Sequence, residues 1–223
     1  MQVPFPVLQK LLVSLCRICD SLFLCTVTAD EIQLEIAQLQ TGKAVGPSSI
    51  PISILKIPKS ELASPLQVIF NTSFLTGIVP DKFKLAKVMP VFKKGFQTNL
   101  SNYRPISLLS VFNKLLEKLM FNWSANFSEK RHLICNKQFG FHSHHLTDHA
   151  VLGIIDQVQK AIEDRDYSCG IFLDFSKAFD TVNHNILLSK LEFYGIRGVV
   201  KDCLLYLISE KQNVNGVTWL CKF

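Results

Sequence analysis

A single aspartate follows directly after a short apolar run in the last quarter of the chain. The run is Gly170 to Leu173, and Asp174 comes next, in the stretch GIFLDFSKAFDTVNH. Such a run is typical of a buried strand, where a carboxylate is costly unless it meets a metal ion, a donor or solvent. Divalent cations such as Mg²⁺ bind carboxylate oxygens, and metal-assisted phosphoryl transfer usually uses two or more carboxylates. The alternative is that Asp174 only caps the turn that follows.

An arginine held beside a proline is the second candidate for chemistry. Arg104 lies between Tyr103 and Pro105. A guanidinium on a restrained backbone suits contact with phosphate, and the neighbouring aromatic ring suits stacking on a base. The alternative is a surface turn that happens to contain an arginine.

Histidines cluster in the stretch FHSHHLTDH, ahead of an expected helix. His145 and His149 are four residues apart and could share a helix face, with Cys135 nearby as a further zinc ligand. The HExxH pattern of zinc peptidases is not met, because position 146 is Leu. A polar loop that leads into a helix is the favoured interpretation.

Positive charge is concentrated in the middle of the chain. The formal net charge is +6, yet residues 81–140 alone hold eleven Lys or Arg and three acidic residues. A basic block beside a nearly neutral remainder indicates a polyanionic partner, either nucleic acid or an anionic membrane surface. A solvated surface that only aids solubility is the alternative.

The cysteines and the apolar N-terminal stretch indicate in which cellular compartment the protein is found. The seven cysteines are irregularly spaced, and Cys16-x-x-Cys19 has no second pair that would complete a zinc site. We expect free thiols in a reducing, intracellular compartment. Charged residues interrupt the apolar N-terminal stretch, so we expect an amphipathic helix over 6–19 rather than a membrane span or a signal peptide.

The elements that must position these residues are mostly helices, which predicts an α+β fold. Apolar periodicity and caps indicate helices over 28–41, 61–77, 110–127, 147–166, 184–195 and 199–209. Strands are expected from 85, interrupted at Pro90, and over 168–174, with an extended segment around 103–109. Residues 211–219 are expected to form a hairpin with Asn215-Gly216 at its turn.

Two of these helices carry clear apolar faces that we expect to pack in the core. Thr28 or Asp30 should cap the helix over 28–41, and the helix over 61–77 should end near Gly77. Ser110 should cap the helix over 110–127, and Thr147 or Asp148 the helix over 147–166. The faces consist of Phe112, Leu115, Leu116, Leu119 and Met120 in the first helix, and Val151, Ile154, Ile155, Val158 and Ile162 in the second.

Taken in order, several segments resemble the reverse transcriptase domain of non-LTR (LINE-type) retrotransposons, in particular the jockey-like elements. The resemblance runs from about residue 22 to residue 218. The segments that carry it are LQTGKAVGPSSIPISILK, FKLAKVMPVFKKG, NYRPISLLSVFNKLLEKLM, NKQFGFHSHHLTDHAV, IFLDFSKAFDTVNHNILLSKLEFYGI and LISEKQNVNGV.

This resemblance implies the fingers and part of the palm of a right-hand polymerase. Its boundaries would be an N-terminal segment 1–24, fingers 25–165 and partial palm 166–223. Asp174 would be the first catalytic Asp and bind Mg²⁺, and RNA template and DNA primer would be the partners. The implied nucleotide-binding residues are Phe179, which screens the sugar 2′ position, with Arg104, Phe175 and His142; those for nucleic acid are Lys87, Lys93, Lys94, Tyr103 and Arg104.

Three departures from the family pattern set a further expectation. Pro47-Ser48-Ser49 stands where Pro-Asp-Gly is common, and His142 replaces an arginine, which should weaken phosphate binding. The chain also stops before the Pro-Gln-Gly motif and the Asp-Asp hairpin of the palm. We therefore expect a fragment that does not polymerise alone, with a nucleic-acid-binding remnant or an unstable pseudogene-like product as alternatives.

Overall fold

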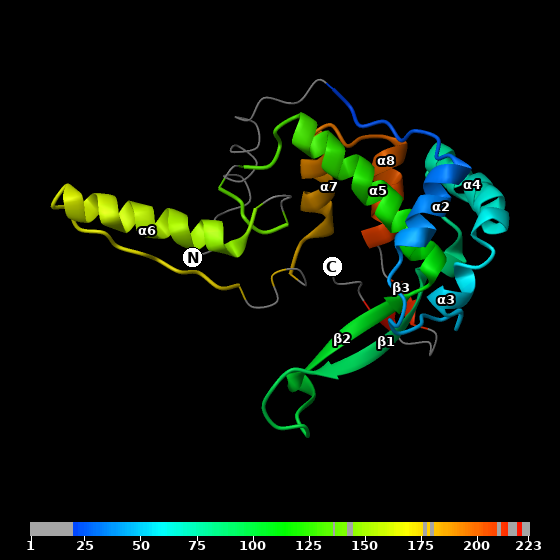
Figure 1. The fold of residues 1–223 in the computed structure, drawn as a ribbon, viewed down its shortest axis with the longest axis horizontal. Helices are drawn as coiled ribbons and strands as arrows, with labels where there is room; N and C mark the ends of the chain where they lie inside the picture. The colour runs from blue at the N-terminus through cyan, green and yellow to red at the C-terminus, as the bar shows by residue number, and fades with distance from the viewer. Residues whose placement is uncertain are drawn as a thin grey trace. The chain divides into compact units, whose positions relative to one another are not determined.

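The computed structural model describes residues 20–135, 137–141, 145–175, 178, 181–208, 211–213 and 218–219. It divides into two compact units (Figure 1). The first consists of residues up to 124 together with those from 179 onward, and the second of residues 125–178. The expected helix over 6–19 lies outside the described residues.

Helices make up most of the first unit, as the apolar periodicity predicted. They are α2 (Ala29–Gln38), α3 (Ile52–Leu55), α4 (Lys59–Thr76), α5 (Val111–Lys130, whose end enters the second unit), α7 (His184–Phe193) and α8 (Val199–Ile208), with 3₁₀ turns η1 (Asp81–Lys84) and η2 (Leu100–Asn102). The short α3 was not expected. None of the described helices is long and apolar enough to cross a membrane.

The predicted helix caps are present in this unit. The Thr28 hydroxyl accepts the backbone N–H of Glu31, and the Glu31 carboxylate accepts the backbone N–H of Thr28 in return. Ser110 Oγ accepts the backbone N–H of Asn113 at the start of α5. The helix α4 ends at Gly77, whose φ of 75° lies in the left-handed region that favours glycine. Local sequence therefore fixes where these helices begin and end.

The core of the first unit lies where α2, α4, α5 and α8 pack together. From the predicted face of α5, Leu115, Leu116, Leu119 and Met120 are buried, and Phe112 packs against the core at its edge. Deeply buried side chains from the other helices include Ile32, Ile36, Phe70 and Cys203. The rings of Trp123 and Phe74 pack edge to face, with centroids 4.8 Å apart.

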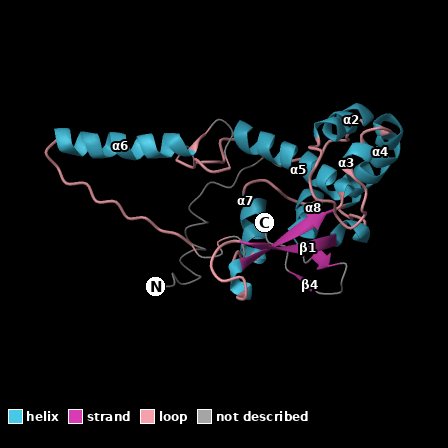
Figure 2. Ribbon diagram, turned by 60° about the horizontal axis from the view of Figure 1, so that its bottom comes forward, coloured by secondary structure: helices cyan, strands magenta, loops and turns pink. Residues whose placement is uncertain are grey.

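A small sheet accompanies these helices (Figure 2). Its order is β2-β1-β3-β4, with β1 (Leu85–Phe92), β2 (Tyr103–Leu109), β3 (Lys211–Asn213) and β4 (Thr218–Trp219). The neighbours β1 and β2 are antiparallel, β1 and β3 parallel, and β3 and β4 antiparallel. The strands of the expected C-terminal hairpin are therefore confirmed, and its turn lies outside the described residues.

The expected interruption of the strand at Pro90 is wrong, because β1 continues through this residue. Pro90 lies opposite Pro105 of β2. The N–H of Lys93 donates to the carbonyl of Asn102, so alternation makes the Pro90–Pro105 pair a non-hydrogen-bonded one. Neither nitrogen points at the partner strand, and the missing N–H groups cost no bond between β1 and β2.

The second unit contains α6 (Thr147–Glu163), and two expectations for this helix are wrong. Leu146 occupies the N-cap position, and its N–H donates to His149 Nδ1, so Thr147 and Asp148 do not cap it. The apolar stripe expected to face the core is exposed: Val151, Ile154, Ile155, Val158 and Ile162 are 38–70% exposed. Periodicity shows which residues share a face, but it does not supply an element to cover that face.

The strand expected over 168–174 is not formed. These residues have no regular secondary structure, and the side chains of Ile171, Phe172 and Leu173 are 78–82% exposed. A strand requires a neighbour for its backbone groups, and no described strand pairs with this segment. The expectation of a buried strand was wrong because the apolar run does not itself provide a pairing partner.

Candidate nucleic-acid interface

The basic residues singled out in the sequence meet on the β1–β2 hairpin. Its residues, 85–109, hold Lys87, Lys93, Lys94 and Arg104 and no acidic residue. Figure 1 shows the hairpin extending away from the helices of its unit. Ala86 at its base is buried in the unit, whereas every residue from 89 to 100 is exposed. The hairpin is thus a positively charged arm with an anchored base.

The strand register places three of these cations on one face. Arg104 lies opposite Val91, and side chains of cross-strand partners share a face of the sheet. Because alternate residues of a strand point the same way, Lys87 and Lys93 lie on that face too. Met89, Val91 and Ile106 separate the cations on the same face and are 42–45% exposed. Charges for phosphates therefore alternate with apolar surface that could contact sugars or bases.

Tyr103 lies on the opposite face and is already engaged. Its ring packs against Phe92 with centroids 5.5 Å apart, and its hydroxyl donates to the carbonyl of Gln97 at 2.9 Å. The side chain is half-buried, so it contributes to the hairpin's own structure. The exposed Lys94 follows in the loop at the tip.

The base of β1 is tied to α8 through Tyr206. The Tyr206 hydroxyl donates to the carbonyl of Pro80 at 2.7 Å, and Lys84 Nζ lies 4.2 Å from the ring centroid. Burial, with a smaller effect of the Asp81 carboxylate, raises the pKa of Tyr206 to about 12. The phenol therefore stays protonated and keeps its hydrogen bond at neutral pH.

Two of the candidate catalytic and nucleotide-binding residues belong to the second unit, and two lie outside the described residues. Asp174 and Phe175 belong to the second unit, and both are exposed. Phe179 and His142 lie outside the described residues, as does Asp180. The structure therefore places the predicted nucleic-acid-binding residues on one hairpin, and the predicted nucleotide-binding set stays a prediction.

A metal site around Asp174 is not assembled by the described residues. Within these residues, no group of three or more His, Cys, Asp or Glu side chains could hold a metal ion. A two-metal centre needs several carboxylates converging on one point. The described residues alone therefore do not complete such a centre around Asp174. They also form no zinc site from His145, His149 and Cys135.

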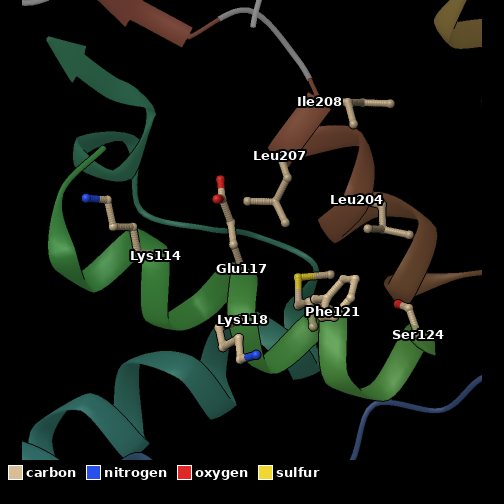
Figure 3. A pocket seen from close by; sticks show the side chains of 9 residues that line it. Lys114, Glu117, Lys118, Phe121, Ser124, Leu204, Leu207 and Ile208 are labelled. Atoms are coloured by element: carbon tan, nitrogen blue, oxygen red, sulfur yellow. The ribbon is translucent and has the colours of Figure 1, made fainter. Parts of the chain in front are cut away.

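An apolar hollow lies between α5 and α8 and was not foreseen from the sequence. Its volume is about 470 Å³, and Leu204, Leu207 and Ile208 of α8 line it, with Leu207 next to the Glu117 side chain of α5 in Figure 3. The signal for it was the long side chains on α5 outside its predicted core face, such as Phe121, which is 63% exposed.

Phe96 in the hairpin tip was not among the site residues predicted from the sequence. This ring is 83% exposed, directly after the Lys93-Lys94-Gly95 turn. A lone aromatic within a turn of basic residues was the available signal.

Comparisons with known proteins agree with the ordered motifs. A family model described as reverse transcriptase (RNA-dependent DNA polymerase) matches residues 91–221. The RNA-directed DNA polymerase from mobile element jockey of Drosophila melanogaster is 32% identical over 171 residues, which cover 76% of this chain and 19% of that protein. The probable RNA-directed DNA polymerase from transposon BS of the same fly is 30% identical over 177 residues, covering 76% and 20%.

A jockey polymerase from Drosophila funebris is 30% identical over 165 residues, covering 74% of this chain and 18% of that protein. The chain thus spans about a fifth of the length of these curated relatives. The family model covers more than half of the chain, and its match contains both Arg104 and Asp174. The chain therefore belongs to the reverse transcriptase (RNA-dependent DNA polymerase) family.

Proposed function

We propose that this chain holds RNA template for a retrotransposon reverse transcriptase, with the β1–β2 hairpin as its main contact. The observation that carries the proposal is the exposed hairpin, with four basic residues and no acidic one. In this proposal residues 25–165 are the fingers and residues 166–223 begin the palm of a right-hand polymerase.

The chemistry of the hairpin suits a sugar–phosphate backbone. Each cation that neutralises a phosphate releases condensed counterions, so binding should weaken as salt is raised. Lys87, Lys93 and Arg104 share a face, so one strand of nucleic acid can meet all three. The exposed apolar side chains between them suit contacts to sugars, which do not depend on salt.

Catalysis by this chain alone is not part of the proposal. The family generally uses divalent metal ions, and we propose Asp174 as a ligand for Mg²⁺ and Phe175 and Phe179 as neighbours of the nucleotide. The described residues form no group of three or more His, Cys, Asp or Glu side chains that could hold a metal ion there. A primer-extension assay with template, primer and Mg²⁺ should therefore show no product. Robust extension that vanishes in Asp174→Asn would show that the chain is an active polymerase.

RNA binding is the direct test of the proposed function. Fluorescence anisotropy with a labelled RNA should give a dissociation constant that rises steeply with salt. Each phosphate contact contributes a slope of about 0.7 in a plot of log affinity against log salt for single strands. Charge reversal of Lys93, Lys94 and Arg104 to Glu should flatten the slope by about two and weaken binding at low salt by at least about tenfold.

A matched variant controls for net charge. Lys43, Lys59 and Lys160 are exposed and lie outside the hairpin, so their reversal to Glu changes the net charge by the same amount. This variant should bind with nearly the wild-type salt slope. Equal loss in both triple variants would mean that overall charge, and not the hairpin, attracts RNA.

The compartment is a further part of the proposal. Cys25, Cys135 and Cys169 are free and exposed thiols, as Cys203 is a free and buried one. Exposed free thiols are best kept in a reducing, intracellular environment, where RNA template and DNA primer are also found.

A further inference from the structure

We propose that the tip of the hairpin, residues 93–102, is a binding site for single-stranded nucleic acid, with the Phe96 ring as the platform on which one unpaired base stacks. The inference rests on the proposed function and deepens it. It assigns the tip a preference for unpaired bases, which the cationic face of the strands does not provide.

The tip loop is held in one shape by its own hydrogen bonds. Asn102 makes three of these bonds. Its backbone N–H donates to the carbonyl of Asn99, and its carbonyl accepts the backbone N–H of Lys93. Its side-chain amide donates to the carbonyl of Phe96 at 2.9 Å. The N–H of Asn99 also donates to the carbonyl of Phe96. The Phe96 carbonyl oxygen therefore accepts two hydrogen bonds, which restrain the backbone at this residue.

The glycine before Phe96 completes this arrangement. Gly95 has a φ of 95°, and a Cβ on it would lie 2.7 Å from the Asn102 side-chain nitrogen. The chain can therefore turn sharply against the Asn102 side chain before it reaches Phe96. Because the backbone on both sides is constrained, a base that stacks on the ring has little chain entropy to overcome.

The Phe96 ring is presented to solvent instead of to the protein. It is 83% exposed. An exposed aromatic ring on an ordered loop gains little from the fold but offers a flat apolar face to a ligand. Stacking of a base on such a ring contributes about 1–3 kcal/mol and does not depend on base identity.

The surroundings of the ring favour a polyanion over a protein partner. Lys93 and Lys94 lie within three residues of Phe96, and the hairpin has no acidic residue. Lysine is depleted from the centres of protein–protein interfaces, whereas ammonium groups beside an aromatic ring are the usual pattern of single-strand binding sites. Bases in a duplex interior are already stacked on both faces, so the ring selects unpaired bases.

A cycle of protein and ligand changes tests the stacking contact. The probes are labelled oligothymidylate of about ten nucleotides and a DNA of the same length whose sites are abasic, measured by anisotropy. Phe96→Ala should weaken oligothymidylate binding about five- to 100-fold and leave binding of the abasic DNA within twofold. The salt slope should stay unchanged, because no cation is removed, and Phe96→Tyr should restore binding.

A matched control lies outside the hairpin. Phe23 is 78% exposed, so Phe23→Ala removes a similarly exposed aromatic ring and should change binding by less than twofold. Both positions are at the surface, and thermal unfolding should match the wild type in each variant.

Three results would overturn the inference while wild-type binding remains. One is Phe96→Ala that binds oligothymidylate like the wild type. Another is equal weakening for both DNAs. The third is self-association by sedimentation that Phe96→Ala abolishes without any effect on DNA, which would make the tip a protein contact. Wild-type protein that binds neither RNA nor oligothymidylate would instead refute the proposed function itself.

Discussion

Gly46 should be among the least replaceable residues of the first unit, although it lies in a loop. The residue is buried against the junction between β2 and α5. A Cβ added to Gly46 would collide with the carbonyl oxygen of Leu109, and would lie 2.6 Å from the Leu109 carbonyl carbon and 3.0 Å from the Ser110 nitrogen. All three are backbone atoms, so no side-chain rotation can relieve the contact.

The expected cost of Gly46→Ala follows from this geometry. Added methyl groups in packed sites cost about 1–3 kcal/mol when neighbours can shift, and here the neighbour is the last residue of β2. We expect a loss at the upper end of that range, or a fall in melting temperature of roughly 6–12 °C. Ser110 caps α5, so the displacement should also loosen the start of this helix.

Urea unfolding followed by tryptophan fluorescence measures this loss. Trp123 contacts Phe74 in the core, and a Trp219→Phe background leaves Trp123 as the one emitter of the two tryptophans. The control is Gly153→Ala, because nothing lies within 4 Å of the added Cβ and the site is in the interior of α6. That change should stabilise α6 by about 1 kcal/mol. A Gly46→Ala protein within about 0.5 kcal/mol of wild type would refute the argument.

Two further predictions concern stability. The unfolding free energy should fall as pH rises from about 9 to about 12. Burial and the Asp202 carboxylate raise the folded pKa of Cys203 from 9.0 to about 11. The folded pKa of Tyr206 is raised from 10.0 to about 12. Because both pKa values are raised in the folded protein, the unfolded state releases its protons at lower pH. In Cys203→Ala the urea midpoint should therefore fall less steeply with pH between 9 and 11 than in the wild type. A pH profile identical to that of the wild type would contradict this assignment. Thr28→Ala should cost about 1 kcal/mol by removing one half of the capping box with Glu31, while Thr28→Ser should match wild type; equal midpoints for Ala and Ser would count against the cap.

Local features were predictable from sequence because their causes are local. Thr28, Ser110 and Gly77 fix helix ends through bonds to their immediate neighbours, and the structure has these ends as expected. The apolar spacing on α5 identified four of its buried residues for the same reason.

Features that depend on a distant partner were not predictable. The run before Asp174 reads as a buried strand, yet no described strand pairs with it, and the side chains stay exposed. The apolar residues on α6 recur with helical spacing, but their side chains are exposed. Pro90 was expected to interrupt its strand. It does not, because it lies opposite Pro105 at a position where neither proline nitrogen faces the partner strand, and the hairpin loop sets that register.

The candidate site shows the same division between local and distant causes. Lys93 and Arg104 are eleven residues apart in sequence, and only the ladder that joins Lys93 to Asn102 brings them onto one face. The sequence could flag both residues as basic and exposed, but their common face came from the register. Phe96 was not predicted as a site residue because a single aromatic residue in a loop belongs to no periodic pattern.

The residues proposed for RNA binding and the residue proposed for metal binding belong to different units of the chain. The cations proposed to hold RNA lie on a hairpin whose buried base, Ala86, and whose contact at Gly46 belong to the first unit. Asp174, the proposed metal ligand, belongs to the second unit. A hairpin built and anchored within one unit needs no completed metal site to keep its shape. In our proposal RNA binding does not depend on polymerisation, so an inactive polymerase assay leaves the proposed RNA contact intact.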